Sequence, residues 1–175
     1  KEFSDWIASI KKHNVETIVH HKRVVPLEHK FYDMDLHITS LEKIKELKHI
    51  PDYDYVMKYK KRNKKKLPVP DHIELIKALG ENIPCLYFNF SRLACEKKAR
   101  ELARKKVFHQ SPEIAAIVRK KLMNAPSELN KITSARILRE VLPYHIGFHH
   151  AGLLPILKEL VEELFAQGLI KVLYT

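Results

Sequence analysis

Residues 145–175 read HIGFHHAGLLPILKELVEELFAQGLIKVLYT, and the order of patterns in this stretch decides the fold class. The segment 145–149 has the length and apolar centre of a short strand. Pro155 then opens a segment with apolar residues at helical spacing, and Gly168 stands where a helix would end. The segment 170–174 is again short and apolar. Strand, helix and strand in this order predict a parallel βαβ unit with a right-handed crossover.

The same alternation begins upstream with the segment 83–90, IPCLYFNF, which is typical of a strand covered on both faces because it is nearly all apolar. A helix is expected before it, over 71–80, between a capping aspartate and a C-terminal glycine. Ser91 can cap the helix that follows the strand, and Ser111 is placed in the same way before another helix. A further helix stops before Pro143. These segments predict an α/β fold with a parallel sheet, whose functional side chains lie at the carboxyl ends of the strands.

The patterns nearer the N-terminus are weaker. An amphipathic helix is expected over 3–10, and a strand over the β-branched segment 15–19. The segment 27–37 alternates loosely and predicts a second strand. Thr39 and Glu42 fit a capping box, in which the hydroxyl and the carboxylate satisfy free backbone donors at the start of a helix.

Composition sets the class of partner. The chain has 175 residues and a formal net charge of +11, from 32 Lys and Arg against 21 Asp and Glu. This balance favours a polyanionic partner, with nucleic acid ahead of an acidic membrane. Only four glycines occur, and these residues contain no GxGxxG or GxxxxGK[ST] phosphate loop. Cys85 and Cys95 form no CxxC pair, so reduced thiols and a cytoplasmic (intracellular) location are expected.

The densest charge lies in residues 58–66, KYKKRNKKK, where seven of nine residues are cationic. Repulsion between like charges predicts a mobile loop. Two interpretations remain open, a solvated insertion without a dedicated ligand and an auxiliary nucleic-acid contact. The candidate contacts in the second case are Lys60, Lys61, Arg62 and Lys64.

Two polar clusters follow predicted strands, and both carry a family resemblance. Residues 86–96, LYFNFSRLACE, resemble motif IV of the superkiller-type (Ski-two-like) DExH helicases of superfamily two, roughly F-x-F-S-[KR] followed by a cysteine and usually a glutamate. Residues 149–155, HHAGLLP, with Lys158 and Glu159 after them, resemble the HH[AS]GLLP…KE signature of that family. Residues 3–31 are similar to the stretch that follows motif III.

The resemblance implies a fragment of an ATP-dependent RNA or DNA helicase, which is an NTP hydrolase. Residues 1–25 would be the tail of the first RecA-like domain and the crossover. Residues 26–175 would be the second RecA-like (P-loop NTPase-type) domain, incomplete, with inserted helices and truncated before motif V. A chain that stops inside a strand would leave Val172 and Leu173 uncovered, so self-association is expected.

The cofactors and partners follow from the same resemblance. ATP and Mg²⁺ would act in the parent protein. The fragment alone would bind neither, because it lacks the Walker A, DExH and arginine-finger motifs. Its partners would be single-stranded RNA or DNA and the remainder of the parent chain, and no membrane.

The expected role of the fragment is to form part of the surface that grips the nucleic acid. The residues with this role are Ser91, Arg92, His150, Ala151, Gly152 and Lys158, and Phe88, Asn89 and Phe90 complete motif IV. The chemistry agrees at Ser91 and Arg92, because free N–H groups, a positive helix-dipole end and a guanidinium favour a phosphate. A capping serine beside a solvated arginine remains the simpler interpretation.

Two other classes of function remain open. A non-catalytic basic scaffold domain would bind RNA or DNA without an ATP site. A metal-dependent hydrolase would use His149 and His150, with His145 completing an H-x-x-x-H spacing. Gly147 and the strand pattern break the helix that this spacing needs, so no metal site is expected.

The 175 residues by themselves are expected to hydrolyse no ATP, because phosphoryl transfer needs a phosphate cradle and a Mg²⁺-binding carboxylate together. Phosphate release measured with and without RNA checks this. Release above that of a heat-denatured sample would contradict the view that the ATP site lies outside these residues.

Overall fold

The computed structural model describes residues 2–20, 22–33, 36–46, 70–123 and 125–175. The predicted loop 58–66, with Lys60, Lys61, Arg62 and Lys64, lies outside the described residues. None of the helices in the described part of the chain is long and apolar enough to cross a bilayer.

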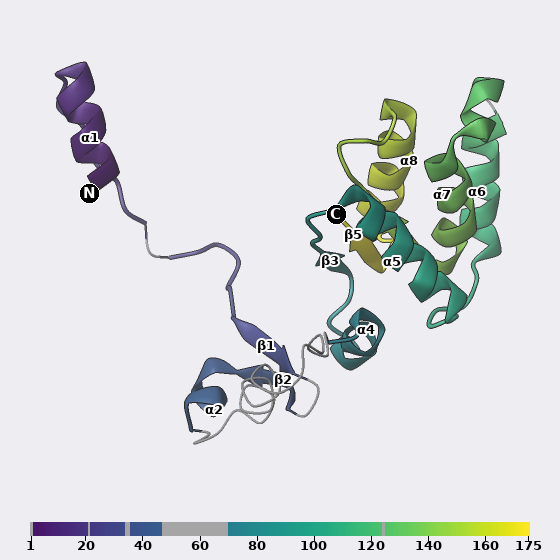
Figure 1. Cartoon of the computed structure of the whole chain (residues 1–175), viewed down its shortest axis with the longest axis horizontal. Helices are drawn as coiled ribbons and strands as arrows, with labels where there is room; N and C mark the ends of the chain where they lie inside the picture. Colours follow the sequence, from purple (N-terminus) through teal and green to yellow (C-terminus); the bar gives the residue numbers. More distant parts are fainter. Residues whose placement is uncertain (1, 21, 34–35, 47–69, 124) are drawn as a thin grey trace, which may run out of the picture.

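Three parallel strands form the sheet beneath the helices at one end of the molecule (Figure 1). They are β3 (Cys85–Tyr87), β4 (Ile146–Phe148) and β5 (Val172–Tyr174), in the order β3-β5-β4. Helix α8 (Pro155–Ala166) connects β4 to β5, as the βαβ pattern predicts. The predicted α/β class with a parallel sheet is therefore confirmed.

The order of the strands corrects two expectations. β3 lies at the edge of the sheet, and Leu86 at its centre is 48% exposed. The prediction of a strand covered on both faces over 83–90 is wrong, because only three of these residues pair and the others lead into an exposed loop. β5 is the central strand, and its Val172 and Leu173 are buried. The expected uncovered edge at these two residues is also wrong, since β3 and β4 pair with both sides of β5.

Helices pack on both faces of this sheet. They are α5 (Arg92–Arg104), α6 (Pro112–Met123), α7 (Thr133–Val141) and α8, with the short 3-10 helices η1 (Ser127–Lys131) and η2 (Leu142–Tyr144). Successive side chains of a strand face opposite ways, so Phe148 and Gly147 face different layers. A Cβ added to Gly147 would lie 3.6 Å from Val161 of α8 and 3.1 Å from the side chains of Ile170 and Leu173. The missing side chain therefore lets α8 approach the sheet closely.

The predicted helix caps are confirmed where serine or aspartate was expected. Ser91 Oγ accepts a hydrogen bond from Ala94 N at 3.4 Å, and Ser111 Oγ accepts one from Ile114 N at 3.3 Å. Asp71 caps α4 (His72–Leu79) in the same way, and Gly80 ends that helix with a φ of 53°. Such a φ favours glycine because it has no Cβ to clash.

The N-terminal part differs more from the sequence prediction. Helix α1 (Glu2–Lys11) forms as predicted and stands apart from the other elements, with no buried residue (Figure 1). The strand expected over 15–19 is wrong, because this segment has no strand beside it in the described residues and Ile18 is 92% exposed. The predicted strand 27–37 is instead an antiparallel hairpin of β1 (Lys30–Asp33) and β2 (His37–Ser40).

The capping box at Thr39 is shifted by one residue. Helix α2 (Leu41–Glu46) begins after Ser40, whose Oγ accepts a hydrogen bond from Lys43 N at 3.4 Å. Thr39 is buried in β2 instead. The hairpin takes Thr39 into its ladder, where it pairs with Phe31, and so leaves the next residue to cap the helix.

A buried histidine attaches α4 to the sheet. The His72 ring lies 5.8 Å from the Tyr174 ring and 6.1 Å from the Tyr87 ring, both in edge-on geometry. Its Nε2 lies 3.4 Å from the carbonyl oxygen of Lys98. Burial, and then the charge of Lys98, lower the pKa of His72 from its ordinary value. The folded protein therefore favours neutral His72.

As the pH is lowered, the free energy of unfolding should decrease more steeply in the wild type than in His72→Phe. As pH drops through about 6.5, an unfolded histidine takes up a proton that folded His72 resists. The stabilising contribution is present above this pH and is lost as the pH falls toward the lowered pKa. Urea unfolding between about pH 7 and pH 5 measures the slope. The exposed His109→Gln variant is the control and should keep the wild-type slope. Equal slopes for the wild type and His72→Phe would contradict the assignment.

Candidate nucleic-acid interface

The two polar clusters predicted from the sequence meet at the carboxyl ends of β3 and β4. Arg92 begins α5 after the β3 loop, and Gly152 lies in the loop after β4. A Cβ added to Gly152 would lie 3.1 Å from Arg92 Cδ and 3.2 Å from Arg92 Nη1. The Arg92 side chain thus packs directly on the backbone of Gly152. A side chain at position 152 would occupy the space that Arg92 fills.

His150 holds this loop in place. Gly152 N–H donates a hydrogen bond to His150 Nδ1 at 3.2 Å, which assigns the ring proton to Nε2. Nε2 donates to Glu96 Oε1 at 3.3 Å, and the same oxygen accepts a hydrogen bond from Ser134 Oγ at 2.5 Å. The side chains of His150 and Glu96 are only 9% and 12% exposed. The network therefore joins α5, α7 and the strand-end loop through one carboxylate.

The two histidines of the HHAG segment point to different sides, as strand alternation predicts. His150 stacks on Phe148, with ring centroids 5.7 Å apart. His149 is more exposed and contacts Glu162 Oε1 of α8 at 2.7 Å. His145 instead contacts the carbonyl oxygen of Leu169 at 2.8 Å. Within the described ranges, no three His, Cys, Asp or Glu side chains are grouped so that they could hold a metal ion.

Beside Arg92 lies an exposed aromatic surface. Phe88 is 75% exposed, and Phe90 is fully exposed. Between them Asn89 is tied to the sheet, because its backbone N–H donates to the carbonyl oxygen of Thr175 at 2.6 Å. Exposed rings can stack on nucleic-acid bases, and the adjacent N-terminus of α5 can receive a phosphate.

The structure therefore groups most of the predicted contacts. Ser91, Arg92, His150, Ala151 and Gly152 all lie at the strand ends, and Ala151 and Gly152 are exposed. His150, however, is turned inward toward Glu96, and it holds the loop by accepting a hydrogen bond from Gly152 N–H. Lys158 is half-buried in the first turn of α8, and no hydrogen bond or ion pair joins it to the group among the described residues.

Sequence reasoning missed the two partners of His150. Glu96 belongs to the motif IV segment, but its role depends on Ser134, which is 38 residues further along. No local spacing pattern reveals such a pair. One signal was present in the sequence. At helical spacing, Glu96 falls on the same side of α5 as the buried Cys95 and Ala99, where a charged side chain needs a partner.

Part of the positive charge on the neighbouring helices is already neutralised. Glu140 Oε2 accepts a hydrogen bond from Arg100 Nε at 2.7 Å, and Glu140 Oε1 lies 3.5 Å from Arg104 Nε. Lys98 lies over the Tyr87 ring, with its Nζ 5.3 Å from the ring centroid. Ion pairs near the surface contribute about 0–1 kcal/mol each, so they organise the surface more than they stabilise it.

Comparison with known proteins shows what the chain is similar to. No protein-family model matches it. Over 99% of its length, however, it is 29% identical to superkiller complex protein 2 of Homo sapiens. Over the same share it is 28% identical to the DExH-box ATP-dependent RNA helicase DExH10 of Arabidopsis thaliana, and 27% identical to the exosome RNA helicase MTR4 of Homo sapiens.

The chain is homologous to the superkiller-type DExH helicases. The resemblance seen in motif IV and in the HHAG segment is thereby confirmed at the level of the whole chain. The chain spans 16%, 20% and 18% of the lengths of these three helicases.

Glu96→Ala should destabilise the protein by about 1–3 kcal/mol, because it leaves the Ser134 hydroxyl and His150 Nε2–H without their buried acceptor. Glu96→Gln keeps one acceptor oxygen and should cost less. Urea denaturation followed by circular dichroism measures both. Glu101→Ala is the control on the same helix, since the Glu101 side chain is 44% exposed and its Oε1 lies 3.8 Å from Lys97 Nζ. A loss at Glu96 no larger than the loss at Glu101 would show that the network contributes nothing.

Proposed function

We propose that this chain forms part of the RNA-gripping surface of an ATP-dependent helicase, within the second RecA-like domain. The observation that carries the proposal is the contact between Arg92 and Gly152, which places a guanidinium, a helix N-terminus and an exposed backbone at one spot. Each of these favours a phosphate group, and together they suit the phosphodiester of a single strand.

The aromatic side chains next to this spot suggest how the strand lies. A base can stack on Phe88 or Phe90 while its phosphate contacts Arg92, since all three belong to one loop and the helix start after it. Stacking does not distinguish bases, because every base has a π-face. The proposed binding is therefore independent of sequence, as a translocating protein requires.

RNA is favoured over DNA by the names of the relatives, two of which are RNA helicases. In the complete protein, ATP and Mg²⁺ would supply the energy for translocation at a site built from other residues. We place residues 1–25 with the end of the first RecA-like domain and residues 26–175 in the second. Opening and closing of the two domains would then move the strand past the surface described above.

The position of Lys158 suggests a supporting role. Its ammonium is a point charge on α8, one turn after the loop that holds Gly152, and it would attract a neighbouring phosphate. The guanidinium of Arg92 can instead make two parallel hydrogen bonds to one phosphate. We therefore expect Arg92 to contribute more than Lys158.

Arg92→Ala should weaken binding of a single-stranded RNA to the 175-residue chain about tenfold, because a charge-assisted hydrogen bond contributes about 1.5 kcal/mol or more. Fluorescence anisotropy at fixed salt measures the affinity. Lys77→Ala is the matched control, since it also removes one positive charge but lies in the last turn of α4, where its Nζ contacts Glu74 Oε1 at 2.8 Å. Equal losses in the two variants would contradict a localised site.

The complete helicase offers a second readout of the same variant. Arg92→Ala and Lys158→Ala should lower RNA-stimulated ATP hydrolysis more than basal hydrolysis, because both residues are assigned to the RNA and neither to the nucleotide. Equal losses of the two rates would assign the residues to folding or to the nucleotide site instead.

A further inference from the structure

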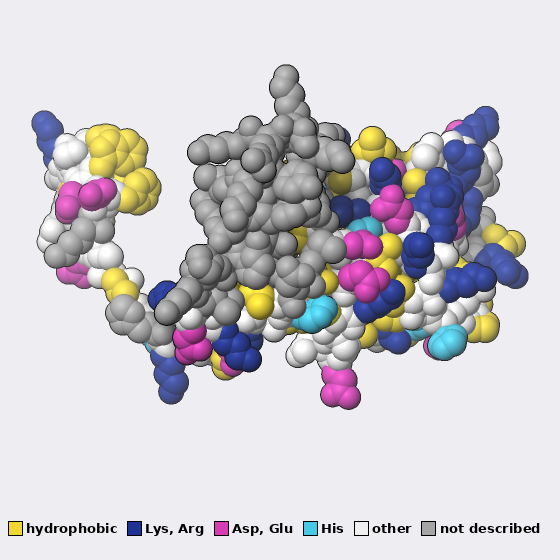
Figure 2. Space-filling view, turned by 60° about the horizontal axis from the view of Figure 1, so that its bottom comes forward, with side chains coloured by type: hydrophobic (Ala, Val, Ile, Leu, Met, Phe, Trp, Pro, Cys, Tyr) yellow, Lys and Arg dark blue, Asp and Glu magenta, His cyan; other side chains and the backbone are white. Residues whose placement is uncertain are grey.

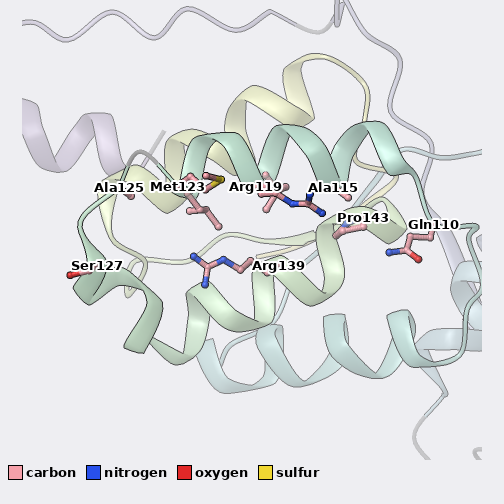
Figure 3. Close-up of a pocket in the computed structure, with 10 residues that line it drawn as sticks. Gln110, Ala115, Arg119, Met123, Ala125, Ser127, Arg139 and Pro143 are labelled. Atoms are coloured by element: carbon pink, nitrogen blue, oxygen red, sulfur yellow. The ribbon is translucent and has the colours of Figure 1, made fainter.

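A hollow lies between α6 and α7, and its lining residues include none of the strand-end residues (Figure 3). Its volume is about 570 Å³, which is in the range of sites that bind small ligands or a few peptide side chains. The hollow is an open groove that runs between the two helices and ends near Pro143 of η2. We call it the α6–α7 groove.

The charge of the α6–α7 groove has one sign. Arg119 enters it from α6 and Arg139 from α7, and none of the described residues that line it is acidic. Figure 3 shows the two guanidinium groups at different places along the groove, Arg119 toward Ala115 and Pro143, and Arg139 toward Met123. A ligand that lies along the groove would therefore meet two cationic groups in succession.

Several nearby carboxylates contact other groups. Glu128 of η1 accepts a hydrogen bond from Ser127 Oγ at 3.3 Å. Glu140, which follows Arg139 in the sequence, contacts Arg100 and Arg104. Glu159 and Glu163 of α8 both contact Lys121, at 3.3 and 2.8 Å. Arg139 takes part in an interaction of its own, but a guanidinium carries five donors and can bind a second acceptor at the same time. Figure 2 shows further Lys and Arg side chains over the end of the molecule where these helices lie.

The floor of the α6–α7 groove is apolar. Val118 and Leu122 form part of it and are each only 3% exposed, while Met123 is 76% exposed. An aliphatic side chain entering the groove would cover this floor and Met123, gaining about 25 cal/mol for each Å² of apolar surface removed from water. The groove thus combines an apolar floor with two cationic walls.

From these features we propose that the α6–α7 groove binds an acidic peptide segment of a partner protein, with an aliphatic side chain on the floor and carboxylates paired to Arg119 and Arg139. A guanidinium binds a carboxylate through two parallel hydrogen bonds, which fixes the register of the peptide. Nucleic acid fits the groove less well. Its phosphodiester backbone has no aliphatic group for the floor, and the described lining residues include no aromatic ring for base stacking.

The test uses the full 175-residue chain and a fluorescein-labelled peptide, DDLDELDD, in anisotropy titrations. Arg119→Gln and Arg139→Gln should each weaken binding at least about fivefold, because each removes a bidentate ion pair. The matched controls are Lys120→Gln on α6 and Arg136→Gln on α7, which remove one charge from the same helices outside the groove lining. They should change the affinity less than about twofold.

Three further experiments distinguish an acidic peptide from other ligands of the α6–α7 groove. The uncharged peptide NNLNQLNN should bind far more weakly than DDLDELDD, and Met123→Glu should repel the acidic peptide while urea denaturation confirms that the variant folds. A single-stranded RNA should bind equally well to the wild type and to Arg119→Gln. The proposal is overturned if the wild type does not bind the acidic peptide, if the control variants lose as much affinity as the groove variants, or if Arg119→Gln weakens RNA as strongly as peptide.

Discussion

Glu96 Oε1 accepts hydrogen bonds from both Ser134 and His150, and this shared acceptor connects α5, α7 and the loop after β4. The carboxylate is nearly buried, so each donor that it satisfies would otherwise be buried without a partner. The bond to His150 also fixes which ring nitrogen carries the proton. That choice leaves Nδ1 free to accept the Gly152 N–H, and the loop then has one conformation in which Arg92 can lie against it. The geometry of the strand-end surface thus depends on a group that never reaches that surface.

The positions of the carboxylates also decide which cations are paired. A protein with a net charge of +11 has too few carboxylates to pair all its cations, so their placement decides which cations stay available. Glu140 takes up Arg100 and Arg104, and Glu159 and Glu163 take up Lys121. These pairs lie on the helical surface. Among the described residues, the lining of the α6–α7 groove has two arginines and no carboxylate, and this charge favours an anionic partner.

The sequence predicted the parts of the fold that local chemistry determines. Ser91, Ser111 and Asp71 cap helices because their side chains need only a backbone N–H two or three residues away, and the βαβ order follows from the alternating patterns of 145–175. The sequence prediction failed where contacts with a distant element determine the local structure. Residues 15–19 have strand-forming side chains, but no strand in the described part of the chain lies beside them. Thr39 pairs with Phe31 in a hairpin, and the residues around Thr39 do not predict this pairing. At the site, Arg92 and Gly152 could be named from motifs, whereas the Glu96–Ser134 pair needed the packing of α5 on α7.

The strand order also constrains how the protein is made. β3 and β4 do not pair with each other, and each is joined to the sheet only through β5, the last of the three strands in the sequence. During synthesis on the ribosome no two of these strands can pair until residues 172–174 have emerged from the exit tunnel. The helices between β3 and β5 are therefore translated before the sheet on which they pack can form. Until then, apolar faces such as that of α5 must contact one another or a chaperone.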